Sequence, residues 1–411
     1  MSSNLKKLLL SLGILVTAGV FAFLLYYLFF RAPVVVPPEV VPPGKTPIDL
    51  TPGATGTPPG QATTPTGTVT PTAPVAPTLP LFTGQTALAT TTVLSEIRAQ
   101  NMTLVPGTSG AAFYDPTTGQ FYRITAEGKI ERISDRTFFG VSDVTWAPKT
   151  DKAILEFPDG SKILYNFSTN TQVTLPKHWE GFTFDPEGSK IAAKSMAYDA
   201  ESRWLFISNA DGSQATPIQS LGTNGDLVDM AWSPSNQIIA FARTGDPRDG
   251  SGQEIIPLGQ NNENFKALIV PGYGFESAWS PDGQKLLFSV YNQDSGYRPT
   301  LWITNGSSDQ IGNNRQSLKL QTWADKCTFQ SSTVLFCAVP SNLEQGAALE
   351  RSLFEAVPDA IYKIDLTTGS EQLIVQSGSD AVTSMSATSD GRYLFYTDQA
   401  SGRIHKVELK P

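Results

Sequence analysis

The chain has 411 residues, a formal net charge of −8 and a hydrophobic content of 40%. An acidic chain without a basic stripe lacks the electrostatic footprint of nucleic-acid-binding proteins, so we expect no nucleic acid among its partners. The hydrophobic content can supply a large core, which the residue pattern confines to about three quarters of the length.

The N-terminus contains an apolar segment. Leu8 to Phe30 is an uncharged run of 23 residues, long enough at about 1.5 Å per residue to cross a bilayer core of about 30 Å. Lys6 and Lys7 precede it, which favours a cytoplasmic N-terminus for residues 1–7. A cleaved signal peptide is the alternative, but its apolar core is usually only about 7 to 15 residues long. We therefore expect a single-pass anchor in the cell membrane, with the lipid bilayer as a partner and the rest of the chain extracytoplasmic.

A low-complexity segment follows the anchor. Residues 31–85 are rich in Pro and Thr and nearly free of charged and aromatic side chains. They cannot bury enough apolar surface to offset the entropy of ordering, so we expect a disordered linker. Active reach across a cell envelope and passive tethering both remain open as its role. Residues 86–101 are the expected connection to the folded domain, with a candidate short helix at Thr92–Gln100.

From residue 102 to 411 one hairpin pattern recurs. Its clearest copies are WSPDGQKLLFSV from Trp279 and WSPSNQIIAFA from Trp232. In the first copy Pro281 fixes its own φ and Asp282-Gly283 turns the chain into an apolar return strand. Weaker copies start at Trp146, Phe184, Phe329 and Ala387.

A third strand follows each hairpin, marked by aromatic residues among aliphatic ones. The seven segments are FYRIT at Phe121, LYNFS at Leu164, WLFIS at Trp204, EIIPL at Glu254, LWITN at Leu301, IYKID at Ile361 and IHKVE at Ile404. Their spacing of about 40 to 60 residues is typical of four-stranded propeller blades. We therefore predict an all-β fold, a β-propeller of seven four-stranded blades with six or eight as alternatives. The last blade lacks a fourth strand after Leu409, so we expect a strand near Met102–Val105 to complete it.

The two cysteines, Cys327 and Cys337, flank a tight turn and should lie on neighbouring antiparallel strands. A disulfide is chemically allowed if the domain lies outside the cytoplasm, and two buried thiols are the alternative. Neither histidine of the chain, His178 or His405, lies near them in sequence, so we expect no metal site there.

Motifs for catalysis are missing from the sequence. It has no G-x-S-x-G nucleophile turn, and the acidic loop at residues 246–254 lacks the ligand spacing of an EF-hand. We expect no catalytic residues, no metal ligands, no cofactor and no enzyme activity.

Together, the hairpins, the third strands and the NADGS turn at Asn209–Ser213 resemble TolB-like, WD-repeat-like bacterial β-propellers over roughly Thr103 to Pro411. Ser235-Asn236 departs from the pattern because it replaces Asp-Gly. The resemblance implies a propeller with protein partners. Some propellers with this hairpin belong to serine hydrolases, but the motif for that activity is missing here.

The connections from second to third strands grow longest, which is where a rigid repeat scaffold can vary its binding loops. The largest insertion, residues 341–360, begins with the capping box Ser341-x-x-Glu344 and predicts a helix over Asn342–Ala356. The expected binding face consists of aromatic and aliphatic side chains: Phe138, Phe139, Trp179, Tyr273, Phe275, Leu343, Leu353 and Phe354.

From this face we predict a non-enzymatic, protein-binding scaffold in the cell envelope, whose partner protein the sequence does not identify. The alternative is glycan or peptidoglycan recognition, which requires Trp179, Tyr273 and Phe275 to form an open aromatic groove. A third hypothesis is an enzyme without a known motif. Clustered carboxylates with shifted pKa values in a polar central channel would favour that hypothesis.

Overall fold

The computed structural model describes residues 88–149, 151–248, 252–263 and 265–409. The chain divides into two units, Met1–Pro80 and Leu81–Pro411, and the described residues belong to the second. The predicted membrane helix Leu8–Phe30 and the linker at residues 31–85 lie outside the described residues. Within the described part of the chain, no helix has the length and apolar character needed to span a membrane.

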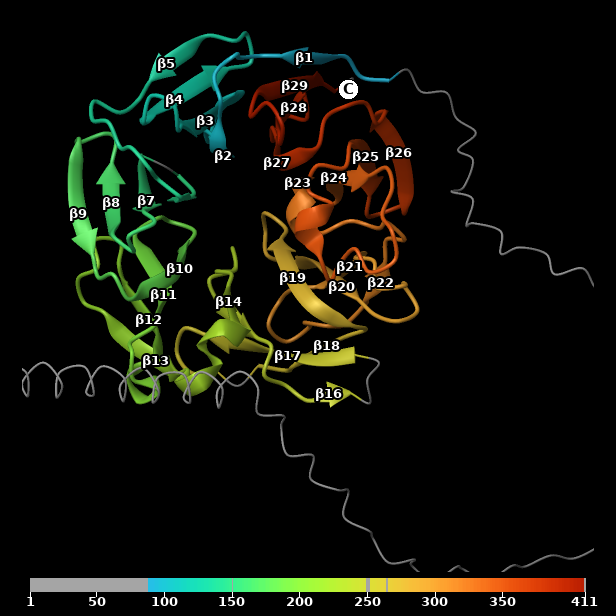
Figure 1. Ribbon diagram of the computed structural model, residues 1–411. Coiled ribbons are helices and arrows are strands. Elements are labelled where there is room, and N and C mark those ends of the chain that lie inside the picture. Colours follow the sequence, from blue (N-terminus) through green and yellow to red (C-terminus); the bar gives the residue numbers. More distant parts are fainter. Residues whose placement is uncertain (1–87, 150, 249–251, 264, 410–411) are drawn as a thin grey trace, which may run out of the picture. The chain divides into compact units, whose positions relative to one another are not determined.

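The described residues form a ring of seven sheets, which confirms the predicted all-β propeller and its seven blades (Figure 1). Within each blade the strands are antiparallel, and they are arranged side by side from the central channel to the outer edge of the ring. The first three blades consist of β2 (Gln100–Leu104), β3 (Gly110–Asp115), β4 (Gln120–Thr125) and β5 (Ile130–Arg132); β6 (Asp143–Trp146), β7 (Lys152–Glu156), β8 (Lys162–Asn166) and β9 (Thr171–Leu175); and β10 (Trp179–Phe184), β11 (Lys190–Ser195), β12 (Trp204–Asn209) and β13 (Thr216–Ser220).

The fourth blade has an extra two-residue strand, because the long β17 pairs with both β16 and β18. Blades 4 to 7 consist of β14 (Val228–Met230), β15 (Ile238–Ala242), β16 (Pro247–Arg248), β17 (Gly252–Gly259) and β18 (Leu268–Val270); β19 (Tyr273–Trp279), β20 (Lys285–Tyr291), β21 (Thr300–Asn305) and β22 (Gln316–Ser317); β23 (Cys327–Ser331), β24 (Val334–Pro340), β25 (Asp359–Asp365) and β26 (Ser370–Val375); and β27 (Val382–Ala387), β28 (Tyr393–Asp398), β29 (Ile404–Glu408) and β1 (Thr91–Val93). In the described part of the chain, four short 3-10 helices lie between strands: η1 (Ala200–Ser202), η2 (Gly222–Leu227), η3 (Ala324–Lys326) and η4 (Arg351–Leu353). All seven predicted third strands are confirmed, as β4, β8, β12, β17, β21, β25 and β29.

The recurring hairpin owes its shape to one polar side chain after the aromatic residue. Ser280 Oγ accepts a hydrogen bond from the backbone N–H of Lys285 at 2.9 Å, and Gly283 takes a left-handed φ of 69°. Ser233 receives the N–H of Ile238 in the same way, at 3.1 Å. Asn236 replaces the glycine there with a φ of 61°, which asparagine tolerates better than most residues. The departure from Asp-Gly therefore leaves the turn intact.

Two of the hairpin tryptophans also connect neighbouring blades. The indole N–H of Trp279 donates to the carbonyl of Ala231 in the preceding blade at 3.1 Å. Trp146 makes the equivalent bond to Asn101 at 2.7 Å. Buried apolar clusters fill the seven interfaces between adjacent blades, so the core is a circle of wedges and not one central mass.

The N-terminal strand β1 completes the last blade by pairing Thr91 with Val407 and Val93 with His405 (Figure 1). Closure by the opposite end of the chain was predicted, but Met102–Val105 was the wrong segment, because those residues contribute to β2 and the loop after it in blade 1. The helix predicted at Thr92–Gln100 is also wrong. The β-branched residues Thr91–Val93 suit a strand, and β29 would otherwise expose an unpaired edge.

The insertion at residues 341–358 is not the predicted helix over Asn342–Ala356. It consists of turns and the three-residue η4. Its backbone N–H groups bond to a neighbouring loop: Gly346 donates to the carbonyl of Gly296 and Ala348 to that of Tyr297, both at 2.9 Å. Gly346 also takes a φ of 88°, which a right-handed helix excludes. Contacts with blade 5 therefore overrode the local capping signal.

Candidate functional face and channel mouth

The two ends of the ring carry different connections. At one end, here called the loop face, second strands join third strands and each blade joins the next. At the other end, the turn face, short turns join first to second and third to fourth strands. Neighbouring strands in a blade point in opposite directions, so successive connections alternate between the two ends of the ring.

Exposed apolar side chains are concentrated on the loop face. Tyr198 is 97% exposed, Leu353 74% and Phe139 70%. Trp204, Leu227 and Leu349 also lie on this face and are exposed. The remaining exposed large apolar residues of the described chain lie on outer or third strands or near β1, and none is in a turn of the turn face: Leu88, Val93, Val173, Ile256 and Ile269. Large exposed apolar groups are typical of interaction surfaces.

The residues predicted for the binding face divide into buried and accessible groups. Phe138 packs on Tyr165 at 4.8 Å between ring centroids, Trp179 on Phe206 at 4.2 Å, and Phe275 on Phe241 at 5.4 Å. The first of each pair is less than a tenth exposed, as is Leu343. Phe139 and Leu353 are exposed, and Tyr273 and Phe354 are partly buried.

The open aromatic groove required for glycan recognition is therefore not formed by Trp179, Tyr273 and Phe275. The first and last are wedge residues between blades. Leu343 and Phe354 pack with Trp323 and Ala347 under the insertion, which holds it on the rim of the ring.

Cys327 and Cys337 are disulfide-bonded in the structure. They are directly opposed on β23 and β24, with Cα atoms 4.1 Å apart. The bond lies within blade 6 and joins its first and second strands. The described residues contain no free cysteine.

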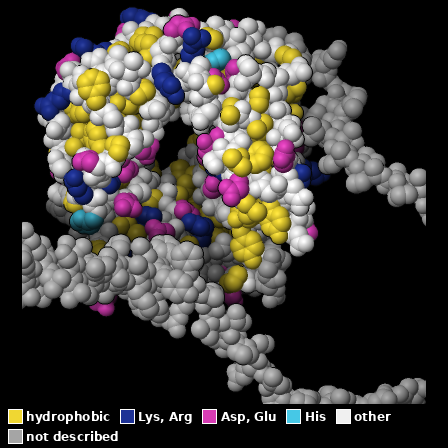
Figure 2. All heavy atoms as spheres, viewed as in Figure 1, with side chains coloured by type: hydrophobic (Ala, Val, Ile, Leu, Met, Phe, Trp, Pro, Cys, Tyr) yellow, Lys and Arg dark blue, Asp and Glu magenta, His cyan; other side chains and the backbone are white. Residues whose placement is uncertain are grey.

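Acidic side chains line the channel. Five of the seven blades place a carboxylate three or four positions before the hairpin aromatic residue: Asp143, Glu180, Asp229, Glu276 and Asp325. Figure 2 shows acidic side chains around the central hollow of the ring. This recurring carboxylate is visible in the sequence when the hairpins are aligned, but we did not identify it from the sequence. It makes the channel mouth a favourable site for positive charge.

An arginine of the insertion reaches this mouth. Arg351 Nη1 contacts both oxygens of Glu276, at 3.0 and 3.1 Å, and Nη2 contacts Asp325. Its guanidinium also lies 4.9 Å from the ring centroid of Trp323. In the adjacent blade Arg243 Nε contacts Asp229 at 2.7 Å. Ion pairs thus connect blade 6 to blade 5 at the loop face.

Glu276 is a carboxyl group of the channel mouth with a raised pKa. Burial raises its pKa to about 6, and the neighbouring charge of Asp325 adds to the shift, while Arg351 opposes it. A carboxyl group that titrates close to neutral pH can serve as a general acid or base. Within the described residues, no cluster of three or more His, Cys, Asp or Glu side chains could hold a metal ion.

A second, buried network lies between blades 6 and 7. Lys326 Nζ contacts Asp359 Oδ2 at 2.7 Å, and the N–H of Val382 donates to the same oxygen at 2.7 Å. Asp359 Oδ1 is buried and has no hydrogen-bond partner among the described residues. Burial raises the pKa of Asp359.

Nearby, His405 belongs to a buried cluster in blade 7. The Tyr396 hydroxyl donates to Asp380 at 2.7 Å and lies 3.1 Å from Nδ1 of His405. Burial, followed by the hydrogen bond to Asp380, raises the pKa of Tyr396. The imidazole ring of His405 stacks on the Tyr396 ring, and His405 pairs with Val93 of the closing strand β1.

No protein-family model matches the chain, and no curated protein matches it. Solved propeller structures are similar to the ring. The β-propeller domain of Cps50 (Swd1) from Myceliophteria thermophila has a TM-score of 0.51 and 10% identity, over 78% of this chain and 100% of that chain. Oligogalacturonate lyase from Vibrio parahaemolyticus has a TM-score of 0.50 and 11% identity, over 80% of this chain and 95% of that chain. These identities show a shared fold alone.

The lyase corrects our expectation that the protein is not an enzyme. That expectation rested on missing motifs, above all the absence of G-x-S-x-G. The lyase is an enzyme that has the same fold. The missing motif therefore does not exclude catalysis in this chain. At 11% identity the likeness assigns no particular activity to this chain.

Proposed function

We propose that the propeller is a binding scaffold that holds a protein partner on its loop face. The observation that carries the proposal is the one-sided distribution of exposed apolar side chains. Tyr198, Leu353 and Phe139 lie in loops of this face, and no described turn of the other face presents an equivalent residue. Aromatic side chains such as that of Tyr198 are enriched among the few residues that carry most of the binding energy in protein interfaces.

The channel mouth indicates the chemistry of the partner. Its carboxylates favour a segment with basic residues, and the exposed apolar side chains around it favour aliphatic or aromatic neighbours to those basic residues. The partner we propose is therefore a protein segment in which basic and apolar residues alternate or cluster together.

We also propose a location in the cell envelope, with the propeller outside the cytoplasm and tethered by Leu8–Phe30. The hydropathy of that segment and the resemblance to TolB-like propellers support this part of the proposal. Removing residues 1–30 should move the protein from the membrane fraction to the soluble fraction. Unchanged fractionation would contradict the tether.

Proximity labelling in the native cell tests the partner. A labelling enzyme fused after Pro411 is compared in the wild type, a loop-face variant and a control. The loop-face variant is Tyr198→Ser with Leu353→Ser, which removes two anchors on opposite sides of the ring. The control is Val173→Ser with Ile256→Ser, on an outer strand and a third strand, where the side chains are 40% and 36% exposed.

We expect the wild type and the control to label the same set of proteins, and the loop-face variant to lose the proteins that make direct contact. Direct contact is then checked by pull-down of the purified pair. Equal labelling by all three forms would contradict binding through the loop face.

A second candidate function is acid–base catalysis at the channel mouth, favoured by the raised pKa of Glu276. Oligogalacturonate is a suitable first substrate because the ring shares its fold with a lyase of that name. Ultraviolet absorbance of an unsaturated product would report turnover. Activity that is lost in Glu276→Gln but kept in the control variant would support this function, and an inactive wild type would reject it for this substrate.

A further inference from the structure

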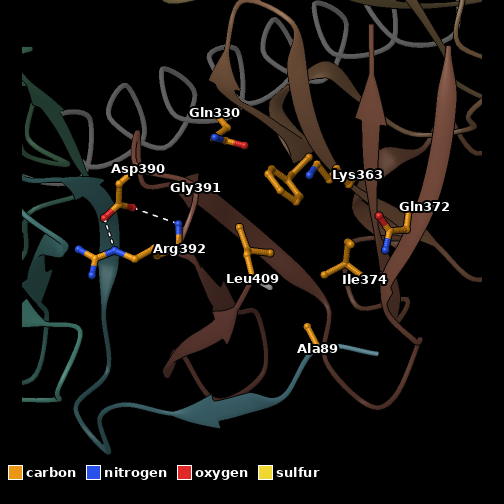
Figure 3. A pocket seen from close by; sticks show the side chains of 10 residues that line it. Ala89, Gln330, Lys363, Gln372, Ile374, Asp390, Gly391, Arg392 and Leu409 are labelled. Atoms are coloured by element: carbon orange, nitrogen blue, oxygen red, sulfur yellow. Dashed lines mark hydrogen bonds and ion pairs between the residues drawn. The ribbon is translucent and has the colours of Figure 1, made fainter. Parts of the chain in front are cut away.

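A cavity of about 240 Å³ lies between blades 6 and 7 at the turn face (Figure 3). Gln330 lies near the end of β23, Gly391 lies in the first turn of blade 7, and Leu409 and Ala89 come from the two ends of the described chain. The cavity therefore lies where the ring closes, and it is separate from the loop face.

One wall is a row of side chains across blade 6. Phe336, Lys363 and Gln372 are directly opposed on β24, β25 and β26, so their side chains share one face of the sheet. Phe336 and Ile374 pack in the apolar cluster between blades 6 and 7, which shows that this face looks toward blade 7. The row places one ammonium group between an aromatic and an amide side chain.

The other wall is the turn of blade 7. Arg392 Nε donates to Asp390 Oδ2 at 2.6 Å, as the dashed line in Figure 3 shows. Gly391 contributes no side chain, and a Cβ atom there would lie only 2.7 Å from Nε2 of Gln330. Figure 3 shows Leu409 between the two walls. The result is an apolar floor with polar groups at the rim.

Lys363 is the unusual member of this site. Its ammonium group has no hydrogen bond and no ion pair among the described residues, although the residue is partly buried. Lys406 stands at the corresponding position of the third strand in blade 7, and its Nζ donates to the carbonyl of Ala126 at 3.0 Å and contacts Glu408 at 2.9 Å. With Arg392 the cavity has two cationic side chains and one carboxylate, Asp390. An ammonium group without a protein partner in the wall of a partly apolar cavity is available to pair with an anionic ligand.

We propose that this cavity binds a carboxylate attached to a small branched apolar group. The carboxylate pairs with Lys363 at the rim, and the apolar group packs on Phe336, Ile374 and Leu409. The volume lies below the roughly 300 to 1,000 Å³ of pockets for drug-sized ligands, so the ligand is small. Free short-chain carboxylic acids have this chemistry, and so does the C-terminal residue of a peptide that ends in leucine or valine.

Calorimetric titration of the full-length protein tests the site with four probes. Isovalerate and its neutral analogue isovaleramide test the need for the carboxylate. N-acetyl-Gly-Gly-Leu and its C-terminal amide distinguish a chain terminus from a free acid. We expect isovalerate to bind and isovaleramide not to bind. Tighter binding of the peptide acid than of isovalerate would assign the site to chain termini, and binding of isovalerate alone would assign it to free acids.

Variants locate the binding. Lys363→Gln should weaken the binding of the carboxylate probe by about tenfold or more, because it removes a charge-assisted hydrogen bond. Lys363→Arg should retain binding. The control is Lys177→Gln, at an exposed lysine that pairs with Asp159 and lies outside the cavity. Circular dichroism and melting temperature verify that each variant folds.

Two outcomes would overturn the proposal. One is that neither carboxylate probe binds the wild type. The other is that Lys363→Gln folds normally and binds them as tightly as the wild type does. The site is independent of the partner proposed for the loop face, so the double variant Tyr198→Ser with Leu353→Ser should bind isovalerate normally.

Discussion

The loop face and the turn face are made from the same strands but follow different rules. The turn face repeats one device, in which a polar side chain after the aromatic residue holds a left-handed turn residue, as in Ser280 with Gly283 and Ser233 with Asn236. The loop face has connections of unequal length, ion pairs between side chains of different loops, and most of the exposed aromatic residues. The repeated architecture therefore belongs to the turn face, and the features that differ from blade to blade are concentrated on the loop face.

The buried ion pair behind the loop face should give the largest effect on stability. Asp359→Ala leaves the ammonium of Lys326 buried without its partner, and breaking such a pair typically costs about 3 to 5 kcal/mol. Urea unfolding followed by tryptophan fluorescence measures the loss.

The double variant Lys326→Met with Asp359→Leu is the control for this pair. It replaces both charges with apolar groups of similar size and should recover most of the lost stability. A single variant as stable as the wild type would show that water, not Lys326, satisfies the carboxylate. The exposed pair for comparison is Lys177 with Asp159, where Asp159→Asn should cost much less because solvent screens the interaction.

One glycine on each face allows the cost of backbone strain to be compared between the two faces. Gly283 on the turn face has a φ of 69°, and a Cβ atom would lie 2.9 Å from the backbone nitrogen of Ser235 in the neighbouring turn. Gly283→Ala should cost about 2 to 3 kcal/mol from strain and crowding together. Gly346 in the loop-face insertion has a φ of 88° but open space around it, so Gly346→Ala should cost only about 1 kcal/mol. Melting temperatures of the two variants measure the difference, and equal losses would show that crowding between turns is unimportant.

The indole hydrogen bond between blades should have a smaller effect. Trp279→Phe keeps an aromatic ring but removes the donor to Ala231, which should cost about 1 kcal/mol. Trp302→Phe is the control, because its indole N–H donates to Thr300 within its own strand at 3.1 Å. If both variants lose the same stability in urea unfolding, the bond between blades has no special role.

The same contrast explains what could be predicted from the sequence. The aromatic hairpins and the seven third strands follow local rules of alternation and turn chemistry, so blade number and strand positions were accessible. The insertion was not, because its N–H groups bond to Gly296 and Tyr297, which lie 45 or more residues earlier in the chain. The segment Thr91–Val93 was misassigned for a similar reason, since its partner β29 is at the far end of the sequence.

The candidate site was only partly accessible. Phe139 and Leu353 are exposed as a binding face requires, but Trp179 and Phe275 fill wedges between blades. Aromatic residues suit both roles, and sequence alone does not distinguish them. The carboxylates of the channel were overlooked because each looks like an ordinary surface residue. Their common distance from the hairpin aromatic becomes meaningful only when the blades are aligned with one another.

The pH dependence of stability should give the smallest and most specific effect on the loop face. Glu276 has a pKa of about 6 in the folded protein, compared with an ordinary value of 4.5. Between these values the folded state binds more protons than the unfolded state, so the contribution of Glu276 to the free energy of unfolding falls as the pH rises from 4.5 to about 6. Glu276→Gln should remove this fall, and its stability relative to the wild type should therefore improve between pH 4.5 and pH 7.

Asp159→Asn is the control, because the pKa of Asp159 is lowered to about 2 and its contribution should stay constant over that interval. Urea unfolding at several pH values gives both curves. A difference between wild type and Glu276→Gln that does not change with pH would mean that burial does not raise the pKa of Glu276, and it would remove the support for acid–base chemistry there.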